Sequence, residues 1–235
     1  MNLKGATALV TGGSSGIGLA IARTFIEGGA KVAITGRDKK RLTSASAAIG
    51  AHPIHADVGQ EADVVRSYTE LFQVFDHLDI LVNNAGVGVL KPLVEMDRDS
   101  FERVFATNVT GAMLMSREAA KHFVQRKSGH IVNIGSTAAV RGAAKGTAYY
   151  ASKFALRGMT ECWRAELRAH NVRVILINPS EVLTNFAATA GFSQTDDNPT
   201  KLQAEDIAHV VKSALEMHDR GFTTELTVFA TNPKD

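Results

Sequence analysis

Cysteine is nearly absent from the sequence, since Cys162 is the single cysteine among 235 residues. An internal disulfide is therefore excluded, and neither this cysteine nor the spacing of the histidines is typical of a metal site. The formal net charge is only +2, so there is no global electrostatic reason to expect a nucleic-acid partner. Apolar runs approaching 18 residues are missing, and no signal or transit segment precedes the first apolar run. We therefore expect a cytoplasmic protein that binds no metal, membrane or nucleic acid.

The sequence does contain an alternation of short apolar runs and helical stripes. The apolar runs are Ala8–Val10, Val32–Ile34, Ile80–Val82, Ile131–Ile134 and Val174–Ile177. Runs of this kind are typical of strands in a parallel sheet that is covered on both faces. Apolar-rich stripes at helical spacing lie between them, at Ile17, Ile21, Thr24 and Phe25, and at Leu156, Met159, Trp163 and Leu167. The pattern predicts a single α/β domain over residues 1–235, with a doubly wound parallel sheet of about seven strands and helices on both faces.

A glycine-rich segment follows the first predicted strand. It reads Thr11-Gly12-Gly13-Ser14-Ser15-Gly16-Ile17-Gly18, and the first helical stripe begins within it. Glycines at such a turn let backbone N–H groups approach a pyrophosphate, and the helix N-terminus adds the positive end of its dipole. Glycines also serve any tight turn, but a strand before and a helix after favour a nucleotide-binding loop.

Tyr149 and Lys153 stand four residues apart, on one face of a predicted helix. An ammonium beside a phenol lowers the phenol pKa and so makes a tuned proton donor. Such a pair also arises by chance on helices, and Tyr150 is only three residues from the same lysine. The pair therefore gains meaning only if the rest of the chain binds a coenzyme and a carbonyl compound.

Taken together, the motifs resemble those of the short-chain dehydrogenases/reductases over nearly the whole chain. The glycine spacing is TGxxxGxG, and Ser136 lies thirteen residues before Tyr149, as in that family. The other matching positions are Asp57-Val58, Asn83-Asn84-Ala85-Gly86, Asn108, Pro179 and Thr184. The resemblance implies a Rossmann fold, a nicotinamide coenzyme and chemistry on carbonyl compounds or alcohols.

The resemblance also implies roles for the matching residues. Ser136 and Tyr149 would hydrogen-bond the substrate oxygen, and Tyr149 would transfer the proton. Lys153 would hold the nicotinamide ribose, and Asn108 would anchor a water that connects Lys153 to solvent. The alternative is that Asn108 merely bonds backbone carbonyls in a helix. The coenzyme would be bound by Gly12, Ser14, Ser15, Gly16, Ile17, Gly18, Arg37, Asp57, Val58, Asn84, Ala85, Gly86, Tyr149, Lys153, Pro179, Val182 and Thr184. For Asn83 and Asn84, the alternative is a purely structural role.

The end of the second predicted strand predicts a preference for NADP(H) over NAD(H). NAD-specific members of the family place an acid there, which binds the ribose 2′-hydroxyl. Here that position is Gly36, and Arg37 follows with a planar set of donors for a 2′-phosphate. The alternative is that Arg37 is one solvated cation in a basic stretch. Asp38 comes one position too late and is predicted to cap the next helix.

Three departures from the family pattern affect substrate and assembly. Ser180 follows Pro179 where the family usually has glycine, no basic residue lies inside the glycine-rich loop, and the chain after Glu225 lacks the usual glycine-rich tail. The tail often joins subunits, so both a homotetramer and a homodimer are expected. A substrate lid is predicted at about 180–200.

The substrate is expected to be a small carbonyl compound that meets a mostly apolar wall. The predicted lining comprises 87–93, 137–144, Phe186, Ala187, Ala188 and Phe192. The resemblance is greatest to 3-oxoacyl-[acyl-carrier-protein] reductases, which implies an acidic carrier protein as partner, docked near Lys127 and His170. Broad or sepiapterin-like carbonyl reductases are the alternative, and a coenzyme-sensing regulator is the candidate from another class.

Overall fold

The computed structural model describes residues 1–184, 186, 190, 198 and 200–232, so the predicted lid falls mostly outside the described residues. The strands are β1 (Thr7–Val10), β2 (Lys31–Gly36), β3 (His52–His55), β4 (Ile80–Asn83), β5 (Gly129–Ile134), β6 (Val172–Pro179) and β7 (Glu225–Val228). The α-helices are α1 (Gly16–Glu27), α2 (Lys39–Ile49), α3 (Glu61–Val74), α4 (Arg98–Phe105), α5 (Ala112–Arg126), α6 (Thr147–Leu167) and α8 (Ala204–Leu215). Shorter turns are η1 (Leu93–Glu95), the π-helical η2 (Ala106–Gly111), η3 (Thr137–Ala139) and η4 (Arg168–His170).

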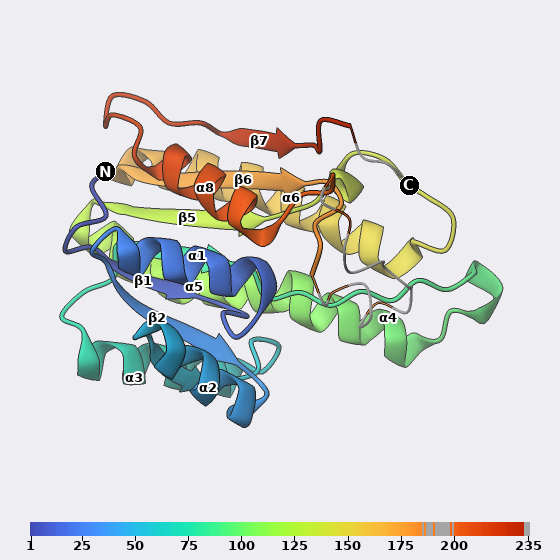
Figure 1. Ribbon diagram of the computed structural model, residues 1–235, viewed down its shortest axis with the longest axis horizontal. Coiled ribbons are helices and arrows are strands. Elements are labelled where there is room, and N and C mark those ends of the chain that lie inside the picture. Colours follow the sequence, from blue (N-terminus) through green and yellow to red (C-terminus); the bar gives the residue numbers. More distant parts are fainter. Residues whose placement is uncertain (185, 187–189, 191–197, 199, 233–235) are drawn as a thin grey trace.

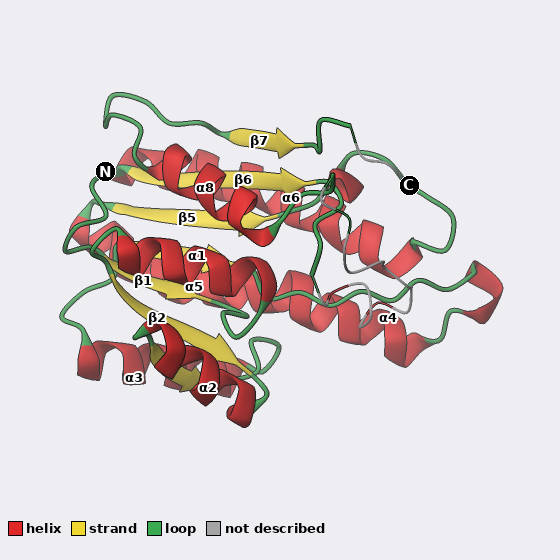
Figure 2. Cartoon of the chain, viewed as in Figure 1, coloured by secondary structure: helices red, strands yellow, loops and turns green. Residues whose placement is uncertain are grey.

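The strands form one seven-stranded sheet in the order β3-β2-β1-β4-β5-β6-β7, with parallel pairing throughout (Figure 2). This confirms the predicted doubly wound architecture. The predicted apolar runs became β1, β2, β4, β5 and β6, whose residues are almost all buried. The edge strands β3 and β7 have no such run, because each has only one neighbouring strand and carries polar residues such as His55 and Glu225.

Helices cover both faces of the sheet (Figure 1). One core forms where α1, α2 and α8 pack on the sheet, around buried residues such as Phe25, Leu42 and Val211. The other forms against α3 and α5, around Leu71 and Phe123, with part of α6 at its margin. Burial of this apolar surface is the main stabilising contribution to such a fold. No described helix is long and apolar enough to cross a membrane.

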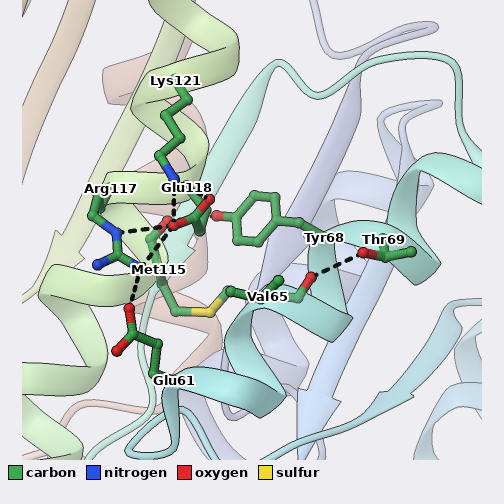
Figure 3. Close-up of polar contacts among 8 residues, drawn as sticks. All are labelled: Glu61, Val65, Tyr68, Thr69, Met115, Arg117, Glu118 and Lys121. Atoms are coloured by element: carbon green, nitrogen blue, oxygen red, sulfur yellow. Dashed lines mark hydrogen bonds and ion pairs between the residues drawn. The ribbon is translucent and has the colours of Figure 1, made fainter.

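Polar side chains join α3 to α5 on the second face (Figure 3). The buried Tyr68 hydroxyl donates to the Met115 carbonyl oxygen over 2.6 Å. Near the surface, Arg117 donates to Glu61 over 2.7 Å and to Glu118 over 2.9 Å. Burial raises the pKa of Tyr68 well above its usual value, so the phenol stays protonated as a donor. These contacts hold α5, which continues from the π-helical turn that carries Asn108.

All strands end at the same edge of the sheet because they are parallel. In folds of this kind, ligands bind in the crevice outside that carboxyl edge. The segments that follow β1, β2, β3, β4, β5 and β6 there contain most of the predicted site residues.

Candidate active site

A cavity of about 320 Å³ opens at the carboxyl edge of the sheet. Of the residues predicted to bind coenzyme, those that line it are Gly12, Ser14, Ser15, Gly16, Ile17, Arg37, Asp57, Val58, Asn84, Ala85, Gly86, Tyr149, Lys153, Pro179, Val182 and Thr184. Gly18 does not line the cavity, and its predicted coenzyme contact stays a prediction. A Cβ there would collide with Gly12 O and Asn84 Nδ2, so glycine at this position allows α1 to pack closely against the loop.

The glycine-rich loop fits a pyrophosphate. Gly12 has φ 63° and Gly16 has φ 52°, a backbone region that favours glycine. A Cβ at Gly12 would also lie 2.9 Å from Ala85 Cα, which is too close. Helix α1 starts at Gly16, and its N-cap Ser15 makes no side-chain capping bond. Gly16 and Ile17 at the start of α1 line the cavity, so this helix terminus can offer N–H groups to an anion there.

Thr11 and Asn84 join this loop to the end of β4. The Thr11 hydroxyl accepts hydrogen bonds from the N–H groups of Asn84 and Ala85, each over 3.0 Å. Asn84 Nδ2 donates back to the Thr11 carbonyl over 3.0 Å and to Gly12 over 3.2 Å. Asn84 therefore has the structural role given as its alternative, while it also lines the cavity. Sequence reasoning did not single out Thr11, although it opens the TGxxxGxG motif.

Asn83 has the structural role that was its alternative. Its Nδ2 donates to Ser116 Oγ and to Asn133 Oδ1, each over 2.8 Å, and Asn133 in turn donates to Thr160. The residues of this network are buried. It joins β4, β5, α5 and α6 beneath the cavity.

Ser136, Tyr149 and Lys153 meet at one wall of the cavity. Ser136 follows β5 and caps η3, where its Oγ accepts the Ala138 N–H over 3.1 Å. Its hydroxyl proton is thereby left for an acceptor in the cavity, either the Tyr149 oxygen or a substrate oxygen. Lys153 Nζ donates to the Ile134 carbonyl over 2.9 Å and lies 5.7 Å from the centroid of the Tyr149 ring. The three side chains thus come together as the resemblance implies.

The pKa of Tyr149 differs from the sequence-based expectation. Burial raises the pKa of Tyr149 to about 12, although a hydrogen bond with Ser136 opposes this change. Burial also lowers the pKa of Lys153 to about 8. The expected lowering of the phenol pKa by the ammonium is therefore wrong for this state of the chain, because desolvation dominates. The phenol is protonated at neutral pH, as a general acid must be.

Asn108 lies in η2 and is buried. Its Oδ1 accepts the Val87 N–H over 2.8 Å, and its Nδ2 donates to Val87 O and to Ser152 Oγ, each over 2.9 Å. The side chain thus holds the segment after β4 against α6. Its role is structural as in the alternative, but its partners are Val87 and the Ser152 side chain and not backbone carbonyls of a helix. The water relay to Lys153 stays a prediction. Ser152 was not singled out in the sequence, although it stands inside the YYASK segment.

The end of the cavity that follows β2 contains Gly36, Arg37 and Arg41. The Arg37 guanidinium is 53% exposed, with Nη1 3.9 Å from Asp57 Oδ2. The Asp38 side chain accepts the Arg41 N–H over 3.0 Å, which confirms the predicted helix cap. The two arginines offer the positive charge that a 2′-phosphate would need.

A second cavity of about 210 Å³ adjoins the Ser136–Tyr149 pair. Its apolar and aromatic lining includes Leu90, Ala138, Tyr150, Phe186 and Ala190. Part of the predicted substrate wall therefore lines this cavity. Leu93, which was also predicted in that wall, is instead 74% exposed on η1. Ala187, Ala188 and Phe192 lie outside the described residues.

The second cavity also has a carboxylate that sequence reasoning missed. Glu181 lines it and forms a 2.9 Å ion pair with Lys201. Val182 pairs with Leu202 in an isolated bridge, which brings the two ends of the predicted lid together. No local motif marks Glu181, because its neighbour Lys201 is distant in sequence. Within the described ranges, no group of three or more His, Cys, Asp and Glu residues could hold a metal ion.

Comparisons with known proteins agree with this geometry. The family model described as short chain dehydrogenase matches residues 6–194. The chain is 34% identical to oxidoreductase asL5 of Sarocladium schorii, over 94% of this chain and 92% of that protein. It is 37% identical to zerumbone synthase of Zingiber zerumbet, over 80% of this chain and 72% of that protein.

Solved structures of other proteins are similar to this chain as well. A 3-ketoacyl-(acyl-carrier-protein) reductase from Brucella melitensis, complexed with NADH, has a TM-score of 0.90 at 30% identity, with 97% of this chain and 98% of that chain covered. A metagenomic short-chain oxidoreductase in complex with NADP has a TM-score of 0.86 at 33% identity, with 99% and 100% covered. The chain therefore belongs to the short chain dehydrogenases, and it is an oxidoreductase that acts on alcohols or carbonyl compounds with a nicotinamide coenzyme.

Proposed function

We propose that the chain catalyses NADP(H)-dependent hydride transfer between nicotinamide and a neutral ketone, with 3-oxoacyl thioesters as the substrate class. The observation that carries this proposal is the apolar cavity beside Ser136 and Tyr149. An apolar cavity with a few polar groups at one end holds an apolar body and orients one oxygen atom. The 3-ketoacyl reductase among the similar structures supports the thioester class.

The described residues can perform the chemistry of such a reduction. A bound nicotinamide supplies the hydride. Ser136 donates a hydrogen bond to the substrate oxygen, where negative charge develops. Tyr149 donates its proton to that oxygen, since its raised pKa of about 12 keeps it protonated. Lys153 would hold the nicotinamide ribose from the same wall of the cavity.

The preference for NADP(H) rests on the charges at the adenosine end of the cavity. Arg37 and Arg41 both line that end, and Gly36 stands where an acid would bind a 2′-hydroxyl. The weak contact of 3.9 Å between Arg37 and Asp57 leaves the guanidinium available for a phosphate. The similar structures hold NADH in one case and NADP in another, so these charges carry the proposal.

The carrier-protein partner needs a different docking surface from the one expected. Lys127 caps α5 directly before β5, and His170 ends η4 directly before β6. Both therefore lie where strands begin, at the opposite edge of the sheet from the cavities. Within one chain, Lys127 and His170 therefore do not flank the mouth of the cavity, contrary to the expectation. We call the second cavity the substrate cavity; it is lined by Ala138 of η3 and Tyr150 of α6. Arg141 and Lys145 are exposed in the segment that joins η3 to α6, and they are the cations we propose for a carrier.

A second candidate substrate class is the compact cyclic ketone. The rings of Tyr150 and Phe186 line the substrate cavity and favour a flat or bulky apolar body. Zerumbone synthase of Zingiber zerumbet and (+)-borneol dehydrogenase 2 of Salvia officinalis are among the relatives, and the compounds in their names support this class. A non-catalytic regulator is disfavoured, because Ser136, Tyr149 and Lys153 come together in the cavity.

A substrate panel tests the proposal. NADPH absorbance is followed with a neutral 3-oxobutanoyl thioester of N-acetylcysteamine, a bicyclic ketone and free 3-oxobutanoate. We expect the thioester to react faster than the free acid, because Glu181 lines the cavity and repels a carboxylate. Glu181→Gln should narrow that difference. A faster reaction with the bicyclic ketone would favour the second class, and no reaction with any ketone would refute the proposal.

A further inference from the structure

Ser136 is held by a buried amide on the neighbouring strand. The Ser136 N–H donates to Asn178 Oδ1 over 3.2 Å, and Asn178 is 1% exposed near the end of β6. The preceding Gly135 N–H donates to the Ile177 carbonyl over 2.7 Å. A Cβ at Gly135 would collide with Asn178 Oδ1, so the close approach requires glycine there. The backbone on which Ser136 stands is thus fixed by the neighbouring side chain.

The orientation of the Asn178 amide is set from its other end. Asn178 Nδ2 donates to Glu225 Oε1 over 2.7 Å, and a carboxylate can only accept. Arg157 of α6 lies on the far side, with Nη2 3.4 Å from Glu225 Oε2. The amide oxygen must therefore face Ser136. Glu225 is the first residue of β7, so the edge strand reaches the active-site wall through this chain of contacts.

We propose that Asn178, Glu225 and Arg157 form a positioning chain that holds Ser136 at the substrate oxygen, an inference that rests on the proposed function. The chain runs from Arg157 through Glu225 and Asn178 to the Ser136 backbone. It acts on geometry alone, since none of its members touches the reacting atoms. Hydrogen-bond donors at a developing charge are effective only when they are held in place.

A reversal of the amide polarity tests the chain. Asn178→Asp keeps an acceptor for the Ser136 N–H but sets a second carboxylate against Glu225. We expect kcat to fall about tenfold, with the NADPH dissociation constant unchanged. The added change Glu225→Gln returns a donor to this contact, so the double variant should regain kcat to within about threefold of the unmodified protein.

Glu161→Gln is the matched control. It removes the other carboxylate beside Arg157, 3.7 Å from Nε, without contact to Asn178. We expect kcat of this variant to equal that of the unmodified protein. An unchanged kcat in Asn178→Asp, or a double variant as slow as Asn178→Asp alone, would overturn the positioning chain.

Hydrogen exchange of the Ser136 amide, followed by NMR without substrate, separates this inference from the proposed function. Exchange should be about tenfold faster in Asn178→Ala than in Glu161→Gln, because the amide loses its acceptor. Equal exchange in the two variants would refute the chain even if ketones are reduced. Failure of the unmodified protein to reduce any ketone would count against the proposed function alone.

Discussion

Tyr149 and Tyr150 are neighbours on α6 but lie in different surroundings. Tyr149 lines both cavities and hydrogen-bonds with Ser136, whereas Tyr150 lines only the substrate cavity. The Tyr150 ring packs against Gly146, where a Cβ would collide with it. We expect Tyr149→Phe to lower kcat at least ~100-fold, as for the loss of a general acid. Tyr150→Phe should keep most of the activity and acts as the matched control.

Steady-state ketone reduction with NADPH measures both tyrosine variants. Since each variant removes one hydroxyl from adjacent positions, effects on folding are comparable and can be checked by thermal melts. If Tyr150→Phe were inactive and Tyr149→Phe active, Tyr149 would not be the proton donor.

The preference between the two coenzymes also depends on single residues. A charge-assisted hydrogen bond from Arg37 to a 2′-phosphate contributes about 1.5–3 kcal/mol, so we expect kcat/KM for NADPH to exceed that for NADH roughly 10- to 150-fold. Arg37→Ala should bring the ratio toward one. Gly36→Asp should invert it, although the new Cβ would lie 3.2 Å from Ser14 Oγ and require a small shift.

The kcat/KM ratio for the two coenzymes, measured at fixed ketone concentration, checks this prediction. Lys39→Ala is a suitable control, because Lys39 is exposed in the same basic stretch and does not line the cavity. Equal use of both coenzymes by the unmodified protein would show that NADP(H) is not preferred.

The element that most directly supports the site is the π-helical turn η2. The buried Asn108 makes three hydrogen bonds, with Val87 N–H, Val87 O and Ser152 Oγ, of which the last is fully buried. Asn108→Ala leaves these groups without that partner, and each such loss costs about 1–3 kcal/mol. We expect the free energy of unfolding to fall by at least about 2 kcal/mol. Ketone reduction should fall as well, because Val87 follows Gly86 in the coenzyme cavity.

Urea unfolding of Asn108→Ala measures this effect. Thr110→Ala, an exposed position of the same turn, is the control and should change stability little. Ser152→Ala removes one of the three hydrogen bonds, so its loss of stability should lie between those of Asn108→Ala and Thr110→Ala. A stability of Asn108→Ala equal to that of Thr110→Ala would show that the turn does not depend on this side chain.

At the scale of the whole molecule, the edge opposite the site contains a buried basic pair. His130 on β5 faces Arg173 on β6 in the register, and Arg173 donates to Asp219 over 2.9 Å. Burial first, and then the Arg173 guanidinium, lower the pKa of His130 to about 4. Folded His130 is therefore neutral between pH 4 and 6.5, where the unfolded chain binds a proton. Stability from this residue is present above pH 6.5 and is lost as pH falls toward 4.

We expect His130→Gln to reduce the loss of stability between pH 7 and pH 4 by up to about 3 kcal/mol, at about 1.4 kcal/mol per pKa unit. Chemical unfolding at several pH values checks this. His209→Gln, on the exposed surface of α8, should show the same pH dependence as the unmodified protein. Parallel curves for His130→Gln and the unmodified protein would contradict the prediction.

The assembly of the whole molecule stays a prediction. The structure describes one chain, so the expected homodimer or homotetramer is tested by sedimentation or light scattering. Within the tail, Glu225–Val228 form β7, which is the edge strand of the sheet beside β6.

The local pattern of residues along the chain was enough to predict the architecture and most of the residues that line the cavity. Apolar runs predicted the interior strands, because an interior strand of a doubly wound sheet is apolar on both faces. The glycine-rich loop, Ser136, Tyr149 and Lys153 were found because each belongs to a motif whose members lie close in sequence or at a fixed spacing. Strands that end at one edge of a parallel sheet bring such motifs together without further information.

Tertiary structure alone decided the properties that depend on burial and on distant partners. The pKa of Tyr149 rises because burial of the phenol dominates, and burial cannot be read from the YxxxK spacing. Gly18 packs closely against Asn84, and Lys127 lies at the edge of the sheet opposite the cavities. The contacts of Glu181 with Lys201 and of Asn178 with Glu225 join residues 20 and 47 positions apart. Only the folded sheet brings these groups within hydrogen-bond distance, so no local pattern marks them.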